Sequence, residues 1–366
     1  MPFDLPEVIA PTLSEQIRSI RRRRRWQTVA LVALLLVACV CSLMIGPVAI
    51  SVPELGQIAW ARISGGQYAG TPTNALVVEQ LRLPRMLMGA LIGAALAVAG
   101  AAMQGLFRNP LADPGLIGVS AGAALGAVTV IVLGERFVPS LPAAFAPYFL
   151  AVAAFAGSLL ATLLIYKLSL HDGQPVVATL LLAGVAINAL AGSLTAFLTF
   201  LATDQQVRDV TFWMLGSLGA TTWPKTGIVA VCVIAGLLMM PVSSRALNAL
   251  LLGESEAAHL GFDVRRTKAI VVALSALMVG AGVAFAGVIG FIGLVVPHVV
   301  RLAAGPDHRF LLPASALLGA TLMVAADLAA RTLVTPAELP IGILTAVFGA
   351  PFFLWLLLRA KSGWQP

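Results

Sequence analysis

Hydrophobic positions along this chain gather into ten long, nearly uninterrupted runs. A helix needs about 20 apolar residues to cross the hydrocarbon core of a bilayer. Because an α-helix satisfies its backbone hydrogen bonds internally, each run predicts a membrane-spanning helix. The predicted spans are 27–50, 84–107, 115–133, 144–167, 179–202, 226–247, 266–288, 291–304, 310–331 and 340–359.

The same pattern places nearly the whole chain in one membrane domain. The polar stretches between the runs are too short to fold as separate enzymes, and the longest are 51–83, 203–225 and 248–265. We therefore expect an all-α, polytopic membrane fold with ten transmembrane helices at 27–360. A basic segment at 1–26 precedes this domain and is expected in the cytoplasm.

Composition explains what the surface of the protein faces. Only 11% of the 366 residues are charged and 59% are hydrophobic. Soluble domains carry roughly 25% charged residues, so this surface is predicted to face membrane lipid. The net charge of +7 has its main source in Arg21 to Arg25, beside the first run, and therefore gives no reason to expect a nucleic-acid partner.

Lys and Arg also predict the orientation. With the N-terminus inside, sixteen of these residues fall on the cytoplasmic side and seven on the external side. This asymmetry obeys the positive-inside rule and predicts a multi-pass protein of the bacterial inner membrane with both termini in the cytoplasm. The seven external cations are Arg62, Arg82, Arg85, Arg136, Arg208, Lys225 and Arg331.

Few residues of this chain are of the types needed for catalysis, metal binding or ion coupling. No G-x-x-x-x-G-K-[ST] phosphate-binding motif occurs, so we do not expect this chain to hydrolyse ATP. The three cysteines lie inside apolar runs, the four histidines lack metal-ligand spacing, and neither a Ser/His pair nor an acidic dyad suggests an intramembrane enzyme. A secondary transporter would need coupling charges across the membrane; the sequence lacks such a chain, and this class stays open as an alternative.

Local patterns predict packing and one rigid turn. Asp327 and Arg331 are spaced i,i+4, which predicts an ion pair near the outer end of the ninth run. Glycines repeat every four residues from Gly118 to Gly126, a pattern typical of tightly packed membrane helices. The loop at 107–115 holds two prolines and a glycine, which predicts a rigid cytoplasmic reversal suited to a gate or a partner contact.

The cytoplasmic stretch 248–264 is predicted to contain two short amphipathic helices. Gly253-Glu254-Ser255-Glu256 is expected to interrupt them. Together with His259, the two glutamates suit the docking of a soluble partner, although a plain loop along the membrane surface is the alternative interpretation.

Several long motifs resemble the iron-siderophore, heme and cobalamin permeases, which are membrane subunits of type II ATP-binding-cassette importers. The resemblance runs from about residue 30 to 360. It is carried by Arg82-Leu83-Pro84-Arg85, the stretch 104–126 with Asn-Pro-Leu-Ala-Asp-Pro-Gly, the stretch 287–298, Asp307-His308-Arg309, the stretch 338–342 and Gly349-Ala350-Pro351.

The resemblance implies an assembly in which this chain is one part. Two copies would form a homodimer with the transport pathway along its two-fold axis. Two ATPase subunits, which bind ATP and Mg, would lie on the cytoplasmic side, and one periplasmic substrate-binding protein would dock outside. The chain itself is expected to bind no cofactor and no metal.

The resemblance also implies roles for individual residues. Arg82, Arg85 and Arg331 match positions that present arginines to acidic residues of the binding protein, where charge complementarity would guide docking. Contact with the ATPases, and so coupling to them, is expected from Leu252, Gly253, Glu254, Glu256, His259, Leu260 and Gly261.

A cytoplasmic gate is implied at two places. Asn109 and Leu111 match an inner gate in the loop between the second and third spans. Cobalamin permeases add a small hydroxylic gate pair just before the fifth span, where this chain has Val177 and Ala178 instead. The second gate therefore departs from the pattern of those permeases.

For the transported substrate, the stretch 204–217 and Asp113 in the reversal loop look most similar to heme permeases. Arg208 would pair with a heme propionate, and Trp213 or Met214 would contact the ring. An anchoring role for Arg208 in the external loop is the alternative. Ferric siderophore and cobalamin remain alternative substrates of the same importer class.

Overall fold

The computed structural model describes residues 13–66, 68, 70–137, 145–334 and 336–362, and within these ranges the fold is helical. The described strands form one short hairpin, in which β1 (Leu170–His171) pairs antiparallel with β2 (Gln174–Pro175). Asp172 and Gly173 have positive φ angles of 49° and 75°, as a two-residue hairpin turn requires. The predicted all-α class is confirmed.

Ten helices occupy the ten predicted spans. Within the described residues, seven helices are long and apolar enough to cross a membrane, and three shorter apolar stretches lie at the third, eighth and tenth predicted positions. The ten are α1 (Leu13–Met44), α4 (Leu83–Leu106), α5 (Val119–Phe137), α6 (Ala146–Leu168), α7 (Val177–Phe200), α9 (Trp223–Met239), α12 (Val264–Ala286), α13 (Ile292–Ala304), α14 (His308–Ala330) and α15 (Ile341–Ser362).

One predicted boundary was wrong. α1 begins at Leu13, not at residue 27, because the arginine run is itself a good helix former and continues the apolar helix without a break. The sixth predicted span, 226–247, lies within Trp223–Leu250, a helical stretch long and apolar enough to cross a membrane. Inside this stretch α9 ends at Met239 and a 3₁₀ turn with Pro241 follows, because proline has no N–H to continue the α-helical ladder.

The stretches that the sequence predicts to be external hold further short helices. α2 (Val52–Ser64), α3 (Pro72–Leu76) and the π-helical turn η1 (Val77–Arg82) lie between α1 and α4. The Glu54 carboxylate accepts hydrogen bonds from Asn74 Nδ2 at 2.6 Å and Tyr68 Oη at 2.7 Å, and these bonds hold its pKa below the ordinary value. They tie α2 to the segment that leads into α4.

A further short helix on the predicted external side, α8 (Asp204–Leu215), is fixed at its start. Thr203 caps the helix, and the Gln206 side chain bonds back to the Thr203 backbone in a capping box. Gln206 Nε2 also donates to the carbonyl oxygens of Ile131 and Val132 at 3.1 and 3.3 Å. α8 is therefore attached to the C-terminal part of α5.

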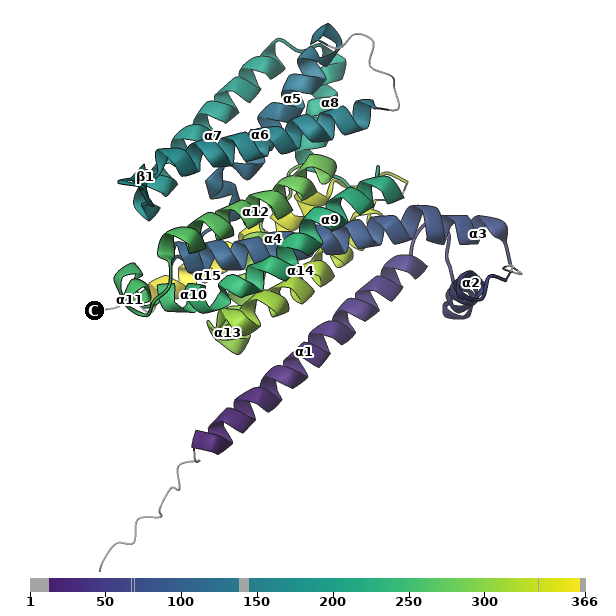
Figure 1. Cartoon of the computed structure of the whole chain (residues 1–366). Helices are drawn as coiled ribbons and strands as arrows, with labels where there is room; N and C mark the ends of the chain where they lie inside the picture. The colour runs from purple at the N-terminus through teal and green to yellow at the C-terminus, as the bar shows by residue number, and fades with distance from the viewer. Residues whose placement is uncertain (1–12, 67, 69, 138–144, 335, 363–366) are drawn as a thin grey trace, which may run out of the picture.

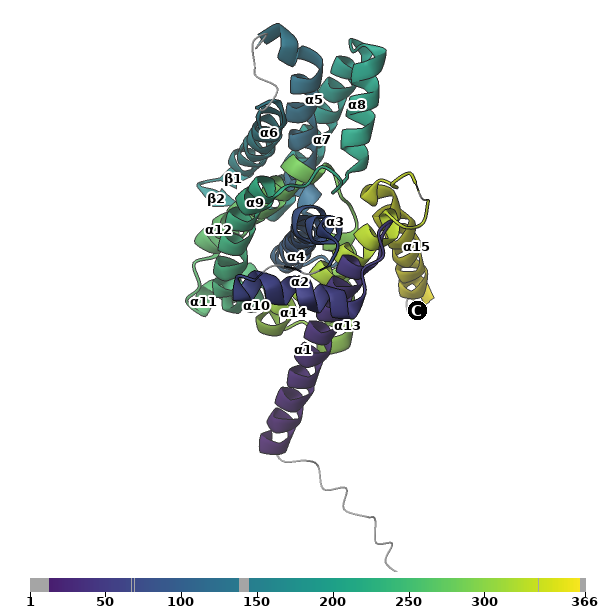
Figure 2. The same ribbon diagram turned by 90° about the vertical axis from the view of Figure 1, so that its right-hand side faces the viewer.

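α4 lies at the centre of the bundle (Figure 2). It packs against α14, α12, α13 and α9, and most of its residues are buried. α5, α6 and α7 form a second group, at the top of Figure 1, that joins the first through α12. α1 lies outside, along α14, with most of its surface exposed, as suits a helix that faces lipid.

Glycines set the closest helix contacts. A side chain at Gly93 would collide with the Gly319 carbonyl of α14, and one at Gly122 would collide with the Gly157 carbonyl of α6. Gly126 meets the Ala153 backbone in the same way. The packing interpretation of the Gly118–Gly126 repeat is therefore confirmed.

This packing predicts a stability difference between two glycines. We expect Gly122→Ala to destabilise the protein by about 1–3 kcal/mol, because the new methyl group overpacks the contact with α6. Gly227→Ala on α9 is the matched control, since a Cβ there meets nothing within 4 Å. Thermal unfolding in detergent should separate the two variants; equal melting temperatures would contradict this packing account.

Candidate functional site

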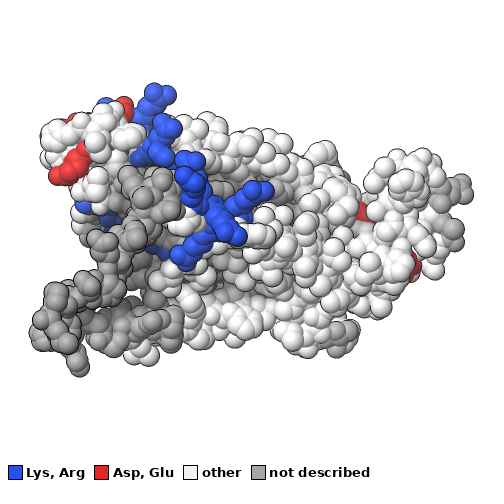
Figure 3. Space-filling model, turned by 90° about the horizontal axis from the view of Figure 1, so that it is seen from below, with Lys and Arg blue, Asp and Glu red and all other residues white. Residues whose placement is uncertain are grey.

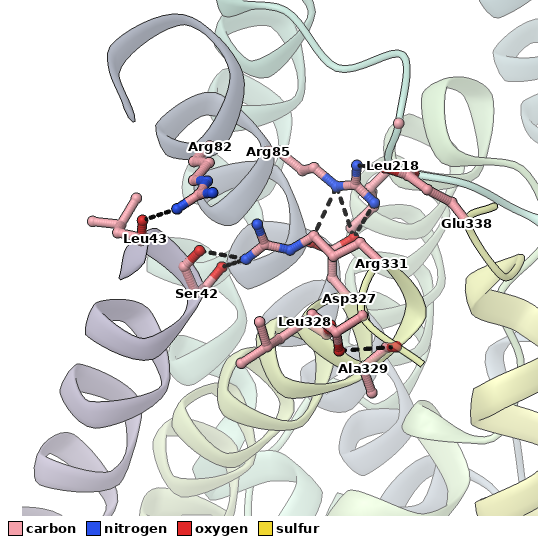
Figure 4. Close-up of polar contacts among 12 residues, drawn as sticks. Ser42, Leu43, Arg82, Arg85, Leu218, Asp327, Leu328, Ala329, Arg331 and Glu338 are labelled. Carbon is pink, nitrogen blue, oxygen red and sulfur yellow. Dashed lines mark hydrogen bonds and ion pairs between the residues drawn. The ribbon is translucent and has the colours of Figure 1, made fainter. Parts of the chain in front are cut away.

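Charged side chains meet where α4 begins and α14 ends, on the side that the sequence predicts to be external (Figure 4). Arg85 Nε lies 2.9 Å from Asp327 Oδ1, and Arg85 Nη1 lies 3.0 Å from Glu338 Oε1. Arg331 Nε is 3.7 Å from Asp327 Oδ2, so the predicted i,i+4 pair is present. Asp327 is buried, and its closest cation is Arg85, a partner that the local spacing did not indicate.

Two of the predicted docking arginines hold the end of α1. Arg331 Nη2 donates to the Ser42 carbonyl and, at 2.9 Å, to Ser42 Oγ. Arg82 Nη1 donates to the carbonyls of Leu43 at 2.6 Å and Met44 at 3.0 Å. The last carbonyls of a helix have no partner within the helix, and a guanidinium with five donors satisfies several at once.

The structure thus brings Arg82, Arg85 and Arg331 together and binds each of them internally (Figure 4). Arg82 and Arg331 are 5% and 7% exposed. The Arg85 side chain is 13% exposed, whereas its partner Glu338 is 47% exposed. In this arrangement Arg85 and Glu338 form the accessible part of the group.

At the other end of α4 the chain reverses in a rigid turn. Asn109 Oδ1 accepts a hydrogen bond from the Leu111 N–H at 2.9 Å. Asp113 Oδ1 accepts one from the Gly115 N–H at 2.7 Å and caps the 3₁₀ turn η2 (Pro114–Ile117). Burial raises the pKa of the Asp113 carboxyl. The tight reversal predicted from the prolines and glycine is present.

This reversal is attached to α7. Asn188 Nδ2 donates to the Gly115 carbonyl at 3.1 Å, and Gly184 lets the η2 backbone approach α7 closely. Val177 and Ala178 are the first residues of the same helix; Val177 is half-buried and Ala178 is exposed. The two predicted gate positions are therefore linked through one helix.

The predicted pair of short cytoplasmic helices is present as α10 (Ser244–Leu250) and α11 (Glu254–His259). The break lies at Leu251–Gly253, because Gly253 adopts φ 133° while Glu254 already begins α11. The predicted interruption by Glu254–Glu256 was therefore wrong. Buried Ala257 anchors α11, and the residues of the predicted contact surface that are exposed are Leu252, Glu256, His259, Leu260 and Gly261.

A polar network ties α10 to α1 and α14. Asn248 Nδ2 donates to Asp307 Oδ1 at 2.7 Å, and Arg24 Nη1 lies 2.8 Å from Asp307 Oδ2. Burial alone would raise the pKa of Asp307, but the bonds from Asn248 and Arg24 hold it below its usual range. Lys and Arg side chains form a band on this face of the molecule (Figure 3).

Sequence reasoning assigned no role to Lys268. Its side chain is 3% exposed, and Nζ lies 2.6 Å from both Glu254 Oε2 and the Pro175 carbonyl oxygen. The sequence did contain one signal, because Lys268 lies at the edge of an apolar run. Burying an unpaired cation there costs free energy, so a partner for Lys268 was to be expected.

An open hollow of about 570 Å³ lies along α5, α7 and α8. Of the three residues predicted for the substrate pathway, the hollow includes Met214. Trp213 is half-buried and packs against the core, and Arg208 is exposed with its Nη2 2.8 Å from Gln205 Oε1. The lining consists of Ser120, Ala121, Ala124, Gly192, Thr195, Ala196, Thr199, Met214 and Val288.

The lining offers hydroxyl groups and small apolar surfaces but no charged side chain. It therefore suits a large ligand with apolar faces, held weakly. Within the described residues, no three His, Cys, Asp or Glu side chains lie close enough to hold a metal ion.

Several known permeases are similar to this chain in sequence. The hemin transport system permease protein HmuU of Yersinia pestis is 50% identical over 282 residues, which cover 77% of this chain and 83% of that protein. The cobalamin import system permease protein BtuC of Halobacterium salinarum is 44% identical over 291 residues, covering 80% and 76%. The vitamin B12 import system permease protein BtuC of Escherichia coli O9:H4 is 43% identical, covering 80% and 86%.

The fold also matches that of a solved structure. A solved structure described as an inward-facing conformation of a metal-chelate type ABC transporter has a TM-score of 0.79 and 33% identity, and the match covers 90% of this chain and 98% of that one. The FecCD transport family matches residues 34–359. The chain therefore belongs to the FecCD transport family and is a membrane permease of that family.

Proposed function

We propose that this chain is the permease subunit of an ATP-driven importer that moves heme from the periplasm to the cytoplasm by alternating access between two copies. The observation that carries the proposal is the hollow along α5, α7 and α8, in a chain that is 50% identical to a hemin permease. The chain supplies the pathway, while separate ATPase subunits supply the energy from ATP and Mg. A periplasmic binding protein delivers the substrate.

The lining of the hollow fits the chemistry of heme. Heme is a flat apolar ring with two carboxylates, so a pathway needs smooth apolar walls and few fixed charges. Gly192 and Ala121 leave room for a broad face, and the Met214 thioether is a soft contact for a ring. The hydroxyls of Thr195 and Thr199 are bonded to carbonyls within α7, which leaves the wall weakly polar.

The open side of the hollow supports a pathway between two copies. α7 exposes large apolar side chains along its length, including Leu182, Val185 and Leu190. A second copy of the chain would close the hollow and separate it from lipid. Weak binding in both inward and outward states would favour release of the substrate.

Substrate choice is tested in liposomes that contain the whole complex with ATP. We expect hemin to accumulate faster than cyanocobalamin or a ferric hydroxamate siderophore, because the lining matches a flat apolar ring. Faster uptake of cyanocobalamin would contradict the heme assignment and support the second candidate, since cobalamin permeases are 43–44% identical to this chain.

Arg208 tests contact with the carboxylates. We expect Arg208→Ala to raise the KM for hemin about two- to fivefold, because an exposed ion pair contributes about 0.2–1 kcal/mol. Arg62→Ala removes another exposed external cation and is the matched control. Unchanged hemin uptake by Arg208→Ala at normal expression would remove the proposed role and leave Arg208 as an anchor for Gln205.

For docking, we propose that an acidic residue of the binding protein replaces Glu338 on Arg85. Glu338 is the exposed partner of Arg85, whereas Asp327 is buried behind it. Arg82 and Arg331 shape the same surface by holding the end of α1. The three arginines would then contribute to docking in different ways.

This arrangement predicts opposite effects of two substitutions. Glu338→Gln should strengthen binding of the binding protein about two- to fivefold, because the competing carboxylate is removed from an exposed pair. Arg85→Gln should weaken it. Binding to the complex in nanodiscs, with Arg62→Gln as control, measures both effects; weaker binding by Glu338→Gln would show that Glu338 itself contacts the partner.

A further inference from the structure

Lys268 joins two segments that lie far from it and from each other in the sequence. Its Nζ donates to Glu254 Oε2, 14 residues away, and to the Pro175 carbonyl, 93 residues away, each at 2.6 Å. The Lys268 residue is 2% exposed, whereas the Glu254 side chain is 42% exposed. A buried ammonium therefore makes one charged and one backbone contact near the N-terminus of α12.

The two partners of Lys268 lie in segments with predicted roles in transport. Glu254 is the first residue of α11, the short helix that also carries Glu256 and His259 of the predicted ATPase contact surface. Pro175 belongs to the hairpin 169–176, which the Val176 N–H closes by donating to the Ser169 carbonyl at 3.0 Å. Val177 then begins α7, the helix that carries one predicted gate pair and holds the other gate loop through Asn188.

The chemistry makes this contact difficult to break. A buried ammonium without partners is unstable, so Nζ strongly favours keeping both acceptors. The Pro175 residue is buried, so solvent does not readily replace the lysine at its carbonyl oxygen. A displacement of α11 would either carry the hairpin with it or leave a charge unpaired in the interior.

We propose that Lys268 is a positioning residue that transmits movement of α11 to the hairpin 169–176 and so to the start of α7. This inference rests on the proposed function, in which separate ATPase subunits move α11. Lys268 touches neither substrate nor nucleotide in this scheme. Its contribution is to couple ATP hydrolysis to opening of the gate.

The first test measures hemin transported per ATP hydrolysed by the whole complex in liposomes. Lys268→Met removes the charge and keeps the length of the side chain, and we expect the ratio to fall about fivefold or more while ATP hydrolysis continues. Arg266→Met is the matched control, because it removes an exposed cation two residues away on the same helix. An unchanged ratio for Lys268→Met would overturn the proposal.

The second test needs no transported substrate. Hydrogen exchange of the peptides 169–176 and 254–260 is compared with and without ATP and vanadate. In the wild-type complex both peptides should respond to nucleotide, and in Lys268→Met only 254–260 should respond. A normal response of 169–176 in the variant would overturn the proposal, whereas no response of 254–260 in the wild type would instead contradict the proposed function.

Glu254→Gln covers the case in which Lys268→Met fails to assemble. This change lies on the exposed side of the contact and keeps a hydrogen-bond acceptor. We expect it to lower the transport-to-hydrolysis ratio about two- to threefold, as loss of one charged partner should. A wild-type ratio in Glu254→Gln, with normal exchange of 169–176, would overturn the proposal in that case.

Discussion

Close contact between helix backbones is the constraint on which this structure depends. In a bilayer, apolar side chains gain little free energy when contacts with lipid tails are replaced by contacts with each other. Membrane helices therefore associate through dense packing and buried polar bonds. α4 meets that requirement on several sides at once, with Gly93 against α14 and Gly100 against the backbone of α13. Gly122 and Gly157 do the same between α5 and α6. The result is a stiff central bundle.

The buried charges lie towards the two ends of this bundle, where they join segments that glycine contacts do not reach. At one end, Arg82 and Arg331 bind the last carbonyls of α1, and Asp327 holds Arg85. At the opposite end, Lys268 joins α11 to the hairpin before α7. Because an unpaired buried charge is costly, each group fixes how its segments sit relative to one another.

Much of the fold was predictable because one physical signal, the length of apolar runs, determines it. The start of α1 was not, since hydropathy marks where a helix enters lipid and says nothing of a polar helix that continues beyond it. The rigid turn at Asn109 was predictable because proline, glycine and Asx chemistry act locally.

The charge contacts were the hardest to predict. The Asp327–Arg331 pair follows from helical spacing, but the bonds from Arg82 to α1 and from Lys268 to Pro175 join residues many positions apart. Nothing in a single sequence fixes such partners. The arginines were therefore recognised as a group at one end, while their internal bonds emerged only from the fold.

The central claim is that transport through this chain takes its energy from separate ATP-hydrolysing subunits. The most direct measurement compares hemin uptake into liposomes that hold the permease alone, under an imposed proton or sodium gradient, with uptake when its ATPase and ATP are also present, the binding protein being supplied in both cases. The account predicts uptake only with the ATPase and ATP, whatever the gradient. Uptake by the permease alone, driven by a gradient, would contradict it.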